Sequence, residues 1–343
     1  MNAAVPTYHA LRVARVVAET ADATSVELDV PTALAPLFAY RPGQFLTLRV
    51  AHPDGELARC YSLSSSPGID AKPRVTIKRV AGGRASNWLC DRLQAGAQVD
   101  VMAPAGVFVP ARLDGDFTLL AGGSGITPML SIIKVVLAQG AGRIWLLYAN
   151  RDAESIIFRG ELQALARQHP QRLVVQHWLD QVQGVPEQEQ MQALLASHGA
   201  DQYFICGPKP FMDGAQAALK ALGVERGKVR VERFVSLDAG VIAPQPEETS
   251  GAATALAVAL DGTNHELTVS AGATLLDAML AAGLNPPNSC RSGSCGACMC
   301  KVEEGRVTLK LNAVLDDDDL AEGWTLACQG VPASDSLRIR FPD

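Results

Sequence analysis

The chain has 343 residues, too many for one ordinary hydrophobic core, and its length predicts two or three domains. Apolar residues make up 48% of it and charged residues 19%, which excludes an intrinsically disordered chain. The net charge is −6, from 30 Lys+Arg and 36 Asp+Glu with no basic stretch, so we expect no nucleic-acid partner.

Short alternating runs dominate the first hundred residues. The N-terminal segment has neither a basic start nor an apolar core, so it predicts no signal peptide. Apolar and polar residues then alternate over six runs, at 9–17, 25–30, 44–50, 58–65, 74–80 and 97–104. Turn sequences such as RPGQ, HPDG and SPGID separate these runs. Many short strands at this spacing predict a small antiparallel β-barrel or sandwich, which we place over residues 1–112.

The pattern changes near residue 113. Buried runs at 116–123, 143–150, 173–178 and 201–208 alternate with helical stretches at 128–139, 158–168, 189–198 and 210–222. Strands that alternate with helices predict an α/β domain with a doubly wound parallel sheet, here over residues 113–236. The apolar stretch 117–138 is long enough to span a membrane, but its glycines, its proline and Lys134 argue against insertion. We therefore expect a soluble, cytoplasmic protein without disulfides.

A glycine-rich loop joins the first strand of this region to its first helix. AGGSGITPML has Gly123, Ser124 and Gly125 in the loop. Thr127 is the predicted N-cap and Pro128 lies in the first helical turn. Such a loop can hold the pyrophosphate of a dinucleotide at a helix N-terminus. A lone glycine-rich loop is a weak signal, but the strand before it and the helix after it strengthen this prediction.

The segment YANRD ends the next strand, where a doubly wound sheet holds the adenosine ribose. Asn150 and Arg151 are therefore candidate contacts of the dinucleotide. Arg151 would meet a 2′-phosphate, whereas Asp152 or Glu154 would bond a free ribose hydroxyl. The first arrangement implies NADPH and the second NADH, and the sequence leaves this choice open.

The composition changes again between 237 and 253, where LDAGVIAPQPEETSGAA has two prolines, many small residues and no periodicity. This segment is a linker by composition. Residues 254–343 predict a hairpin, a helix and a compact α+β domain. They hold 12 Asp+Glu against 6 Lys+Arg, so the net charge of the chain lies entirely in this domain. Its acidic surface is either simply solvated or docks on a basic partner.

Four cysteines in this last domain have the spacing of metal ligands. CRSGSCGACMC places Cys290, Cys295 and Cys298 as C-x4-C-x2-C, and Cys328 follows after 29 residues. This is the plant-type spacing for a [2Fe–2S] cluster, whose two irons need four thiolates. Zinc is the second interpretation, although zinc sites usually present two C-x2-4-C pairs. Cys300 has the wrong offset for a ligand, and we expect it to be a buried strand residue.

CRSGSCGACMC together with LACQ resembles the plant-type ferredoxin domain, a β-grasp fold, over roughly residues 254–343. Such a domain after two others implies flavin and nicotinamide sites upstream. ARCYSLSSSPG resembles the R-x-Y-S motif of the ferredoxin–NADP reductase superfamily. The resemblance implies that Arg59 binds a phosphate, that Tyr61 lies against the flavin ring and that Ser62 bonds its edge, with Cys60 between them.

VTIKRVAGGRASNWL resembles the strand and helix start that follow in the same superfamily. The residues that the resemblance places along the flavin are Thr76, Ile77 and Lys78. It also implies that Gly83 and Ala85 let the backbone approach a pyrophosphate and that Ser86 caps the helix. A pyrophosphate implies FAD, although some relatives use FMN.

Two further segments resemble this superfamily. CGPKPFM is similar to its C-G-P motif beside the nicotinamide, and VERFVS is similar to a strand end that approaches the flavin. The residues concerned are Cys206, Gly207, Pro208, Phe211 and Met212 in the first segment and Glu232 and Phe234 in the second. Without the neighbouring motifs, Cys206 would be interpreted as a buried core cysteine. Glu232 and Phe234 would be equally typical of the end of an ordinary strand. The catalytic candidates that the resemblance implies are Tyr61, Ser62, Cys206, Glu232 and Phe234.

The order of flavin barrel, nucleotide domain, linker and ferredoxin domain resembles the reductase components of multicomponent oxygenases. YANRD and HWLD are most similar to reductases of the steroid 9α-hydroxylase type, with reductases of phenylacetyl-CoA epoxidases nearby. The resemblance implies a monomer that passes electrons from NADH or NADPH through FAD and a [2Fe–2S] cluster to a terminal oxygenase. That oxygenase would be of the Rieske type, or alternatively a diiron enzyme. A zinc-binding module without redox function is the interpretation of a different class.

Overall fold

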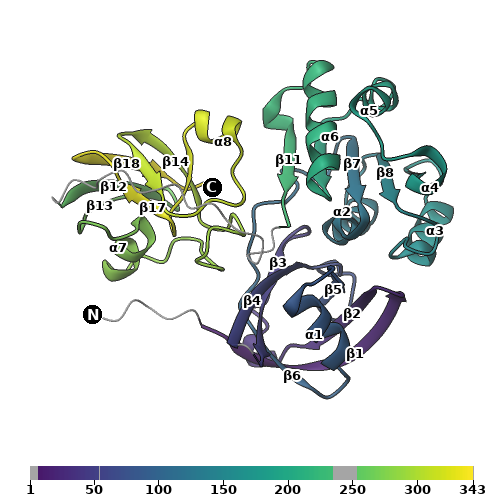
Figure 1. Cartoon of the computed structure of the whole chain (residues 1–343), viewed down its shortest axis with the longest axis horizontal. Coiled ribbons are helices and arrows are strands. Elements are labelled where there is room, and N and C mark those ends of the chain that lie inside the picture. The colour runs from purple at the N-terminus through teal and green to yellow at the C-terminus, as the bar shows by residue number, and fades with distance from the viewer. Residues whose placement is uncertain (1–6, 54, 235–252, 343) are drawn as a thin grey trace. The chain divides into compact units, whose positions relative to one another are not determined.

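The computed structural model describes residues 7–53, 55–234 and 253–342 (Figure 1). Tyr8–Phe234 form one compact unit, and the described residues from 253 onward belong to a second. The predicted linker, 237–253, lies outside the described residues apart from Ala253. Within the described ranges, no helix is both long enough and apolar enough to cross a membrane.

A six-stranded antiparallel sheet forms the first part of the first unit, as the alternating runs predict. Its strands are β1 (His9–Thr20), β2 (Ala23–Asp29), β3 (Phe45–His52), β4 (Gly55–Ser62), β5 (Arg74–Lys78) and β6 (Gln98–Val101), in the order β4-β3-β6-β1-β2-β5. A bridge between Leu63 and Val75 links the two edges, so the sheet closes into a barrel. Helix α1 (Arg84–Arg92) buries Ala85 and Leu89 against the barrel core.

A five-stranded parallel sheet forms the rest of this unit. Its strands are β7 (Phe117–Gly122), β8 (Ile144–Asn150), β9 (Leu173–Leu179), β10 (Gln202–Cys206) and β11 (Val229–Glu232), in the order β11-β10-β7-β8-β9. Its helices are α2 (Ile126–Gln139), α3 (Arg159–Gln168), α4 (Asp180–Gln183), α5 (Gln188–Leu195) and α6 (Lys209–Ala221). These elements confirm the predicted doubly wound sheet.

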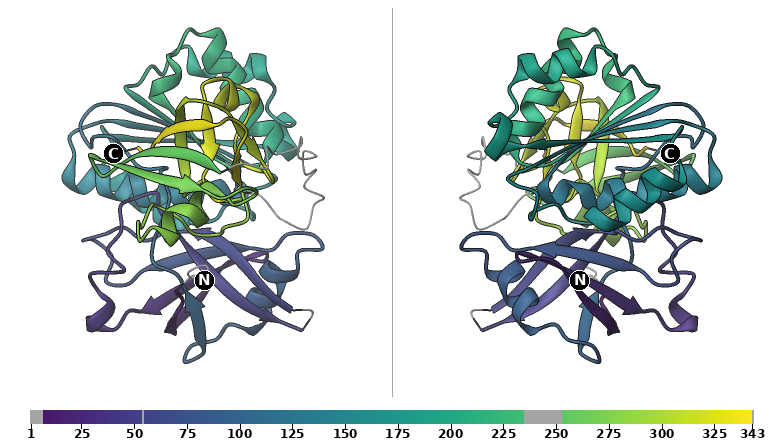
Figure 2. Two further views of the ribbon diagram at one scale, coloured as in Figure 1. Left: turned by 90° about the vertical axis from the view of Figure 1, so that its left-hand side faces the viewer. Right: turned by 90° about the vertical axis from the view of Figure 1, so that its right-hand side faces the viewer.

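Alternate residues of each strand enter two different apolar layers. Leu119 packs with residues of α2 and α3, whereas its neighbour Leu120 packs with residues of α5 and α6. Side chains alternate across a strand, so this division places helices on both faces of the sheet. Both side views in Figure 2 show helices on either side of it. The carboxyl ends of β7, β8 and β10 therefore lie at one edge, where the site is built.

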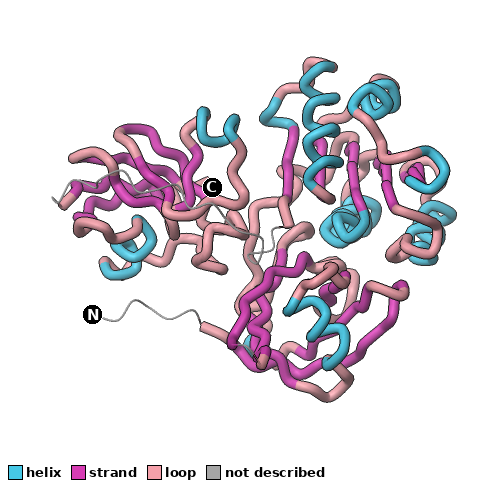
Figure 3. Tube along the Cα trace, in the orientation of Figure 1, coloured by secondary structure: helices cyan, strands magenta, loops and turns pink. Residues whose placement is uncertain are grey.

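The second unit is the expected α+β fold. Its main sheet has the strands β12 (Thr254–Leu260), β13 (Thr263–Val269), β14 (Met299–Glu304), β16 (Trp324–Leu326) and β18 (Ser336–Arg340), in the order β13-β12-β18-β14-β16. A small second sheet pairs β15 (Val307–Leu309) with β17 (Gly330–Pro332), and the helices are α7 (Leu275–Ala281) and α8 (Asp317–Ala321). Helix α7, which Figure 3 shows beside the strands, buries Leu276 and Met279 in the core.

Candidate redox centre

The four predicted cluster ligands lie on one loop and one turn of the second unit. Three cysteines lie between α7 and β14, and the fourth follows β16. The loop curves tightly because Gly293 and Gly296 have φ values of +70° and +69°. A Cβ atom on Gly293 would lie 2.8 Å from the carbonyl oxygen of Leu311, so only glycine fits there. The curvature turns amides inward, and the Ser292 N–H donates to Cys290 Sγ at 3.4 Å.

The cysteine thiols form two pairs. The neighbouring Cys295 thiol, followed by burial, holds the pKa of Cys290 well above its usual range. The Cys328 thiol and burial raise the pKa of Cys298 in the same way. Two pairs match a dinuclear cluster in which each iron takes two thiolates.

Gln329 supports this loop and was not identified from the sequence. Its side chain is buried and donates to the Arg291 carbonyl oxygen at 2.9 Å and to Cys328 Sγ at 3.7 Å. The only sequence signal was its position directly after the fourth cysteine. Cys300 is fully buried on β14, which confirms the expectation that it is a core residue. All eight cysteines are free in the structure.

The R-x-Y-S segment lies at the end of β4. Arg59, Cys60 and Tyr61 are half-buried, and Ser62 is buried. The Ser62 hydroxyl donates a hydrogen bond of 3.0 Å to Glu232 Oε2. These two residues are 170 positions apart, so the bond joins the barrel to the last strand of the parallel sheet.

Glu232 lies opposite Cys206 in the ladder between β10 and β11. Glu232 as a whole is half-buried, but its carboxyl group is shielded from water. This desolvation raises the pKa of the carboxyl to about 8, and the hydrogen bond from Ser62 lowers the pKa by a smaller amount. Burial raises the pKa of the Cys206 thiol, and the Glu232 carboxylate, once it ionises at higher pH, raises it further. At neutral pH both groups therefore hold their protons. The structure thus brings three catalytic candidates together, one from the barrel and two from the sheet.

The β5 candidates differ in how they can meet a ligand. Thr76 is buried, and its hydroxyl hydrogen-bonds to two serine hydroxyls of the barrel. Ile77 is fully buried in the barrel core, so only its main chain can face a flavin. Lys78 is half-buried, and its Nζ lies 3.4 Å from the position of a Cβ on Gly123. Lys78 therefore links the barrel to the glycine-rich loop.

The predicted cap of α1 is wrong. The N-cap is Gly83, not Ser86, and no side chain caps the helix. Ser86 lies in the first turn, where its hydroxyl accepts a hydrogen bond of 3.2 Å from the Val80 amide. A Cβ on Gly83 would lie 2.7 Å from Ser86 Oγ and 3.1 Å from the Val80 carbonyl oxygen. Gly83 is thus required for this close turn, and the first amides of α1, including that of the buried Ala85, carry no side-chain cap.

The predicted cap of α2 is wrong for the same reason. The helix begins at Ile126 with Gly125 as N-cap, and the Thr127 hydroxyl donates to the Ser124 carbonyl oxygen at 3.0 Å. Pro128 lies in the first turn, as predicted. Glycine at both N-caps leaves the helix N-termini open to an anionic group.

The glycine-rich loop packs directly on the end of β10. A Cβ on Gly125 would lie 2.0 Å from the Cys206 carbonyl oxygen, and one on Gly122 would lie 2.8 Å from Pro208 Cδ. Gly123, at φ +52°, turns the chain between them. Glycines at these positions let the loop backbone pack directly against the end of β10. Such a loop without side chains is typical of a binding site for a pyrophosphate.

The end of β8 holds an unsatisfied polar side chain. Asn150 is 4% exposed, and neither its amide oxygen nor its amide nitrogen has a hydrogen-bond partner. The hydroxyl of nearby Tyr148 donates to main-chain oxygens, including that of Gly123 at 3.2 Å. Arg151 Nε lies 2.9 Å from Asp152 Oδ2, and this contact, followed by hydrogen bonds from Ser155, lowers the pKa of Asp152. Arg151 is therefore already paired with an ionised carboxylate.

Two candidates have their side chains in an apolar layer of the sheet, and a third is exposed. Phe211 and Met212 are buried in the layer between α6 and the sheet, so they support the C-G-P turn from beneath. Phe234 is 44% exposed at the end of the first unit. Gly207 and Pro208 form the turn itself, with Pro208 as the N-cap of α6.

Three protein-family models match the chain. They are an oxidoreductase FAD-binding domain over 10–109, an oxidoreductase NAD-binding domain over 119–217 and a 2Fe-2S iron-sulfur cluster binding domain over 258–333. The chain is also 48% identical over 337 residues to the ferredoxin reductase component of 3-ketosteroid-9-alpha-monooxygenase from Rhodococcus rhodochrous, which covers 96% of each protein. The chain belongs to the oxygenase reductases of the ferredoxin–NADP reductase superfamily. It is an NAD(P)H-dependent oxidoreductase with FAD and [2Fe–2S] domains.

Other oxygenase reductases are similar over the same length. A component of the 1,2-phenylacetyl-CoA epoxidase from Escherichia coli K12 is 36% identical over 351 residues and covers 98% of each chain. The crystallised phthalate dioxygenase reductase is 26% identical, with a TM-score of 0.60, and covers 97% of this chain and 98% of its own. These matches confirm the three-part fold and the cofactors expected for an oxygenase reductase.

Proposed function

We propose that the protein carries electrons from NADH to the terminal oxygenase of a 3-ketosteroid 9α-hydroxylase system, an oxygenase of the Rieske type. The observation that carries this proposal is 48% identity over nearly the whole length of the reductase component from Rhodococcus. We assign the FAD-binding domain to 1–112, the nucleotide domain to 113–236, the linker to 237–253 and the ferredoxin domain to 254–343. When bound, FAD and the cluster convert one hydride into two single electrons.

The flavin contacts follow from the barrel. Arg59 would bind a phosphate of FAD, and the uncapped amides after Gly83 would bind its pyrophosphate. Tyr61 would lie against the ring and Ser62 at its edge. Glu232 holds a proton beside Ser62 at neutral pH, because its pKa is raised to about 8. A neutral carboxyl there can donate a hydrogen bond to the flavin edge and adds no negative charge to the site.

The dinucleotide contacts follow from the sheet edge. The loop Gly123–Gly125 would hold the pyrophosphate, and Cys206 and Gly207 would border the nicotinamide. The unpartnered amide of Asn150 matches a ribose diol, which offers both donors and acceptors. Arg151 is neutralised by Asp152, and the ionised Asp152 would repel a 2′-phosphate. This arrangement supports NADH rather than NADPH as the donor.

The test is a reconstitution of the whole path. We expect anaerobic NADH to bleach the flavin of the purified protein and to produce the electron paramagnetic resonance signal of a reduced [2Fe–2S] cluster. The protein should then support 9α-hydroxylation of a 3-ketosteroid by a purified oxygenase. Reduction without hydroxylation would reject the steroid assignment, and a protein without flavin absorbance would reject the whole proposal.

A second candidate partner is a diiron oxygenase, favoured by the 36% identity to the epoxidase component over the full chain. The same reduced protein distinguishes the two. If it supports phenylacetyl-CoA epoxidation and not steroid hydroxylation, the second candidate is correct.

A further inference from the structure

Four charged side chains alternate in sign where the barrel meets the nucleotide region. Lys134 Nζ donates to Asp70 Oδ1 at 2.6 Å, to Asp70 Oδ2 at 2.8 Å and to Glu161 Oε1 at 2.9 Å. Arg74 Nη2 donates to the other oxygen of Glu161, Oε2, at 3.0 Å. We call these four residues, Asp70, Lys134, Glu161 and Arg74, the interdomain clamp. None of them was identified as functional from the sequence.

The clamp is shielded from water. The side chains of Lys134 and Arg74 are only 11% and 15% exposed, and those of both acids are below 30%. Interactions this far from solvent are screened less than surface ion pairs. Lys134 is also the only charged residue of α2, whose other residues are almost all buried. A lysine in such a helix is costly unless it is paired, and here it binds two carboxylates at once.

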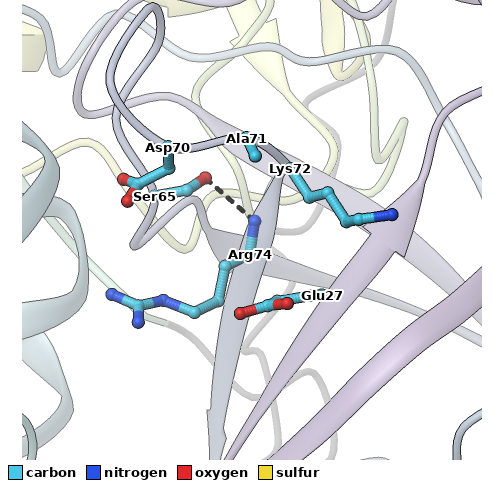
Figure 4. Close-up of a pocket in the computed structure, with 6 residues that line it drawn as sticks. All are labelled: Glu27, Ser65, Asp70, Ala71, Lys72 and Arg74. Carbon is cyan, nitrogen blue, oxygen red and sulfur yellow. Dashed lines mark hydrogen bonds between the residues drawn. The ribbon is translucent and has the colours of Figure 1, made fainter.

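The two sides of the clamp come from different parts of the first unit. Asp70 lies in the loop between β4 and β5, and Arg74 begins β5. Lys134 lies on α2, two turns after the glycine-rich loop, and Glu161 lies in the first turn of α3. Figure 4 shows the barrel side, where Asp70 and Arg74 extend toward the same side while Lys72 points the other way.

Further bonds hold the same contact. Asp70 Oδ2 accepts from the Ser66 amide at 2.6 Å, and the Ser66 hydroxyl donates to the Ser131 carbonyl oxygen of α2 at 3.1 Å. The Arg74 guanidinium lies 5.0 Å from the ring centroid of Phe158, the N-cap of α3. Phe158 has a φ of +61°, which is unfavourable for a bulky residue and needs support from its surroundings.

The small pocket drawn in Figure 4 does not add a ligand site. It is lined by Glu27, Ser65, Asp70, Ala71, Lys72 and Arg74. Asp70 and Arg74 belong to the clamp, and Lys72 pairs with Asp29. The Ser65 hydroxyl accepts from the Arg74 amide at 2.9 Å, the bond dashed in the figure. These charges stabilise the loop and do not point to a missing ligand.

The clamp connects the two halves of the redox site. The loop that carries Asp70 continues directly from the R-x-Y-S segment, so it is fixed to the flavin side. Lys134 and Glu161 lie on the helices that follow β7 and β8, the strands whose ends hold the dinucleotide. A displacement of about 1 Å between two reacting groups can cost on the order of 100-fold in rate. The clamp is therefore placed to control the distance between nicotinamide and flavin.

We propose that Lys134 is a positioning residue for hydride transfer: by binding Asp70 and Glu161 together, it holds the glycine-rich loop, and with it the bound dinucleotide, so that the nicotinamide lies at the working distance from the flavin. This inference rests on the proposed positions of FAD and NADH. None of the contacts proposed for FAD or NADH involves Lys134, so its loss should slow hydride transfer while the contacts that bind NADH within the nucleotide region remain.

The test uses Lys134→Met in the full-length holoprotein, because methionine is an unbranched side chain only one atom shorter and removes the charge. Anaerobic stopped-flow reduction over a series of NADH concentrations gives the hydride-transfer rate constant and the NADH dissociation constant separately. We expect the rate constant to fall roughly 10- to 100-fold while the dissociation constant changes less than about threefold. The long-wavelength charge-transfer absorbance of reduced flavin with NAD⁺ should also weaken. Lys134→Arg should restore both readouts.

Two further variants keep the proposal testable. If Lys134→Met does not fold, the neutral triple variant Asp70→Asn, Lys134→Met, Glu161→Gln leaves Arg74 as the only charge of the four and should show the same slow transfer. The control is Arg143→Met, which breaks an exposed ion pair with Asp116 at the opposite end of the sheet and should leave the rate unchanged.

A wild-type rate constant in a folded clamp variant would overturn the proposal. So would a rise in the dissociation constant with no change in rate, because that would indicate a role in NADH binding alone. If NADH fails to reduce the flavin of the wild-type protein, the proposed function itself fails and this inference fails with it.

Discussion

The two redox regions differ in how far apart along the chain their residues lie. The cluster loop places three of its four ligands within nine residues, Cys290 to Cys298. The flavin and nicotinamide region combines Ser62 with Cys206 and Glu232, up to 170 residues apart. The cluster loop is determined by the spacing of its cysteines and by a few residues with positive φ. The flavin and nicotinamide region depends instead on how the barrel packs against the parallel sheet. The two regions should therefore fail in different ways.

The largest effect should come from a cluster ligand, because no other residue can replace it. In Cys298→Ala we expect the cluster absorbance and the acid-labile sulfide to be lost. The rate of electron delivery to the oxygenase should fall by roughly 1000-fold or more. NADH reduction of the flavin should continue, because that site lies in the other compact unit. Absorbance, sulfide analysis and oxygenase turnover measure the three effects.

Cys300→Ala is the matched control for this variant. Cys300 is also buried but lies outside the proposed ligand set, so its loss should cost only about 1 kcal/mol of packing and leave the cluster in place. Loss of the cluster in Cys300→Ala, or its retention in Cys298→Ala, would contradict the ligand assignment.

A smaller effect is expected from the backbone contact that builds the composite site. In Gly125→Ala the new methyl group would lie 2.0 Å from the Cys206 carbonyl oxygen, so the loop or the end of β10 must move. We expect NADH affinity and hydride transfer together to fall roughly 100-fold, since the pyrophosphate cradle is displaced. Stopped-flow reduction measures both, and cluster content should not change. Gly160→Ala, where a Cβ meets nothing within 4 Å, should behave as wild type.

The sequence predicted the local parts of this molecule better than the composite ones. All six barrel strands, the alternation of strands and helices and the presence of a 2Fe-2S domain follow from periodicity and spacing. The caps at Ser86 and Thr127 were wrong, because cap preferences favour a hydroxyl where this chain uses glycine to keep the helix amides open. Lys134 was visible only as a charge in an apolar stretch. Its partners lie 64 and 27 residues away, and no local pattern predicts such a contact.

The next effect tests the raised pKa of Glu232. Its pKa of about 8 in the folded protein exceeds its ordinary value of 4.5, so the folded state binds this proton more tightly than the unfolded state. The stability of the wild type should therefore decrease, through this group, as the pH rises from about 4.5 to about 8. Glu232→Gln cannot ionise and should not show this decrease. The difference in Tm between Glu232→Gln and the wild type should therefore shift in favour of the variant by roughly 10 °C between pH 5 and pH 8.

Hydride transfer gives a second measurement on the same variant. Above pH 8 wild-type Glu232 becomes charged beside the flavin edge, so we expect the wild-type rate to fall about tenfold between pH 7 and pH 9. The rate in Glu232→Gln should be independent of pH over this range. Parallel pH profiles of the two proteins would show that Glu232 does not titrate at the site.

The smallest expected effect concerns the choice of dinucleotide, because the groups involved are partly exposed. In Asp152→Asn, Arg151 loses its ionised partner and becomes available to a 2′-phosphate. We expect kcat/KM for NADPH to rise about tenfold while that for NADH falls less than about threefold, because the variant removes only one solvent-exposed charge from the site. Calorimetric binding of 2′,5′-ADP and of 5′-AMP checks the same preference without turnover. Asn150→Ala should instead weaken 5′-AMP binding and leave the preference in place, because its amide bonds the ribose and carries no charge. If Asp152→Asn leaves the ratio of the two ligands unchanged, the charge at this position does not select the dinucleotide, and the selection must come from the shape of the loop around Asn150.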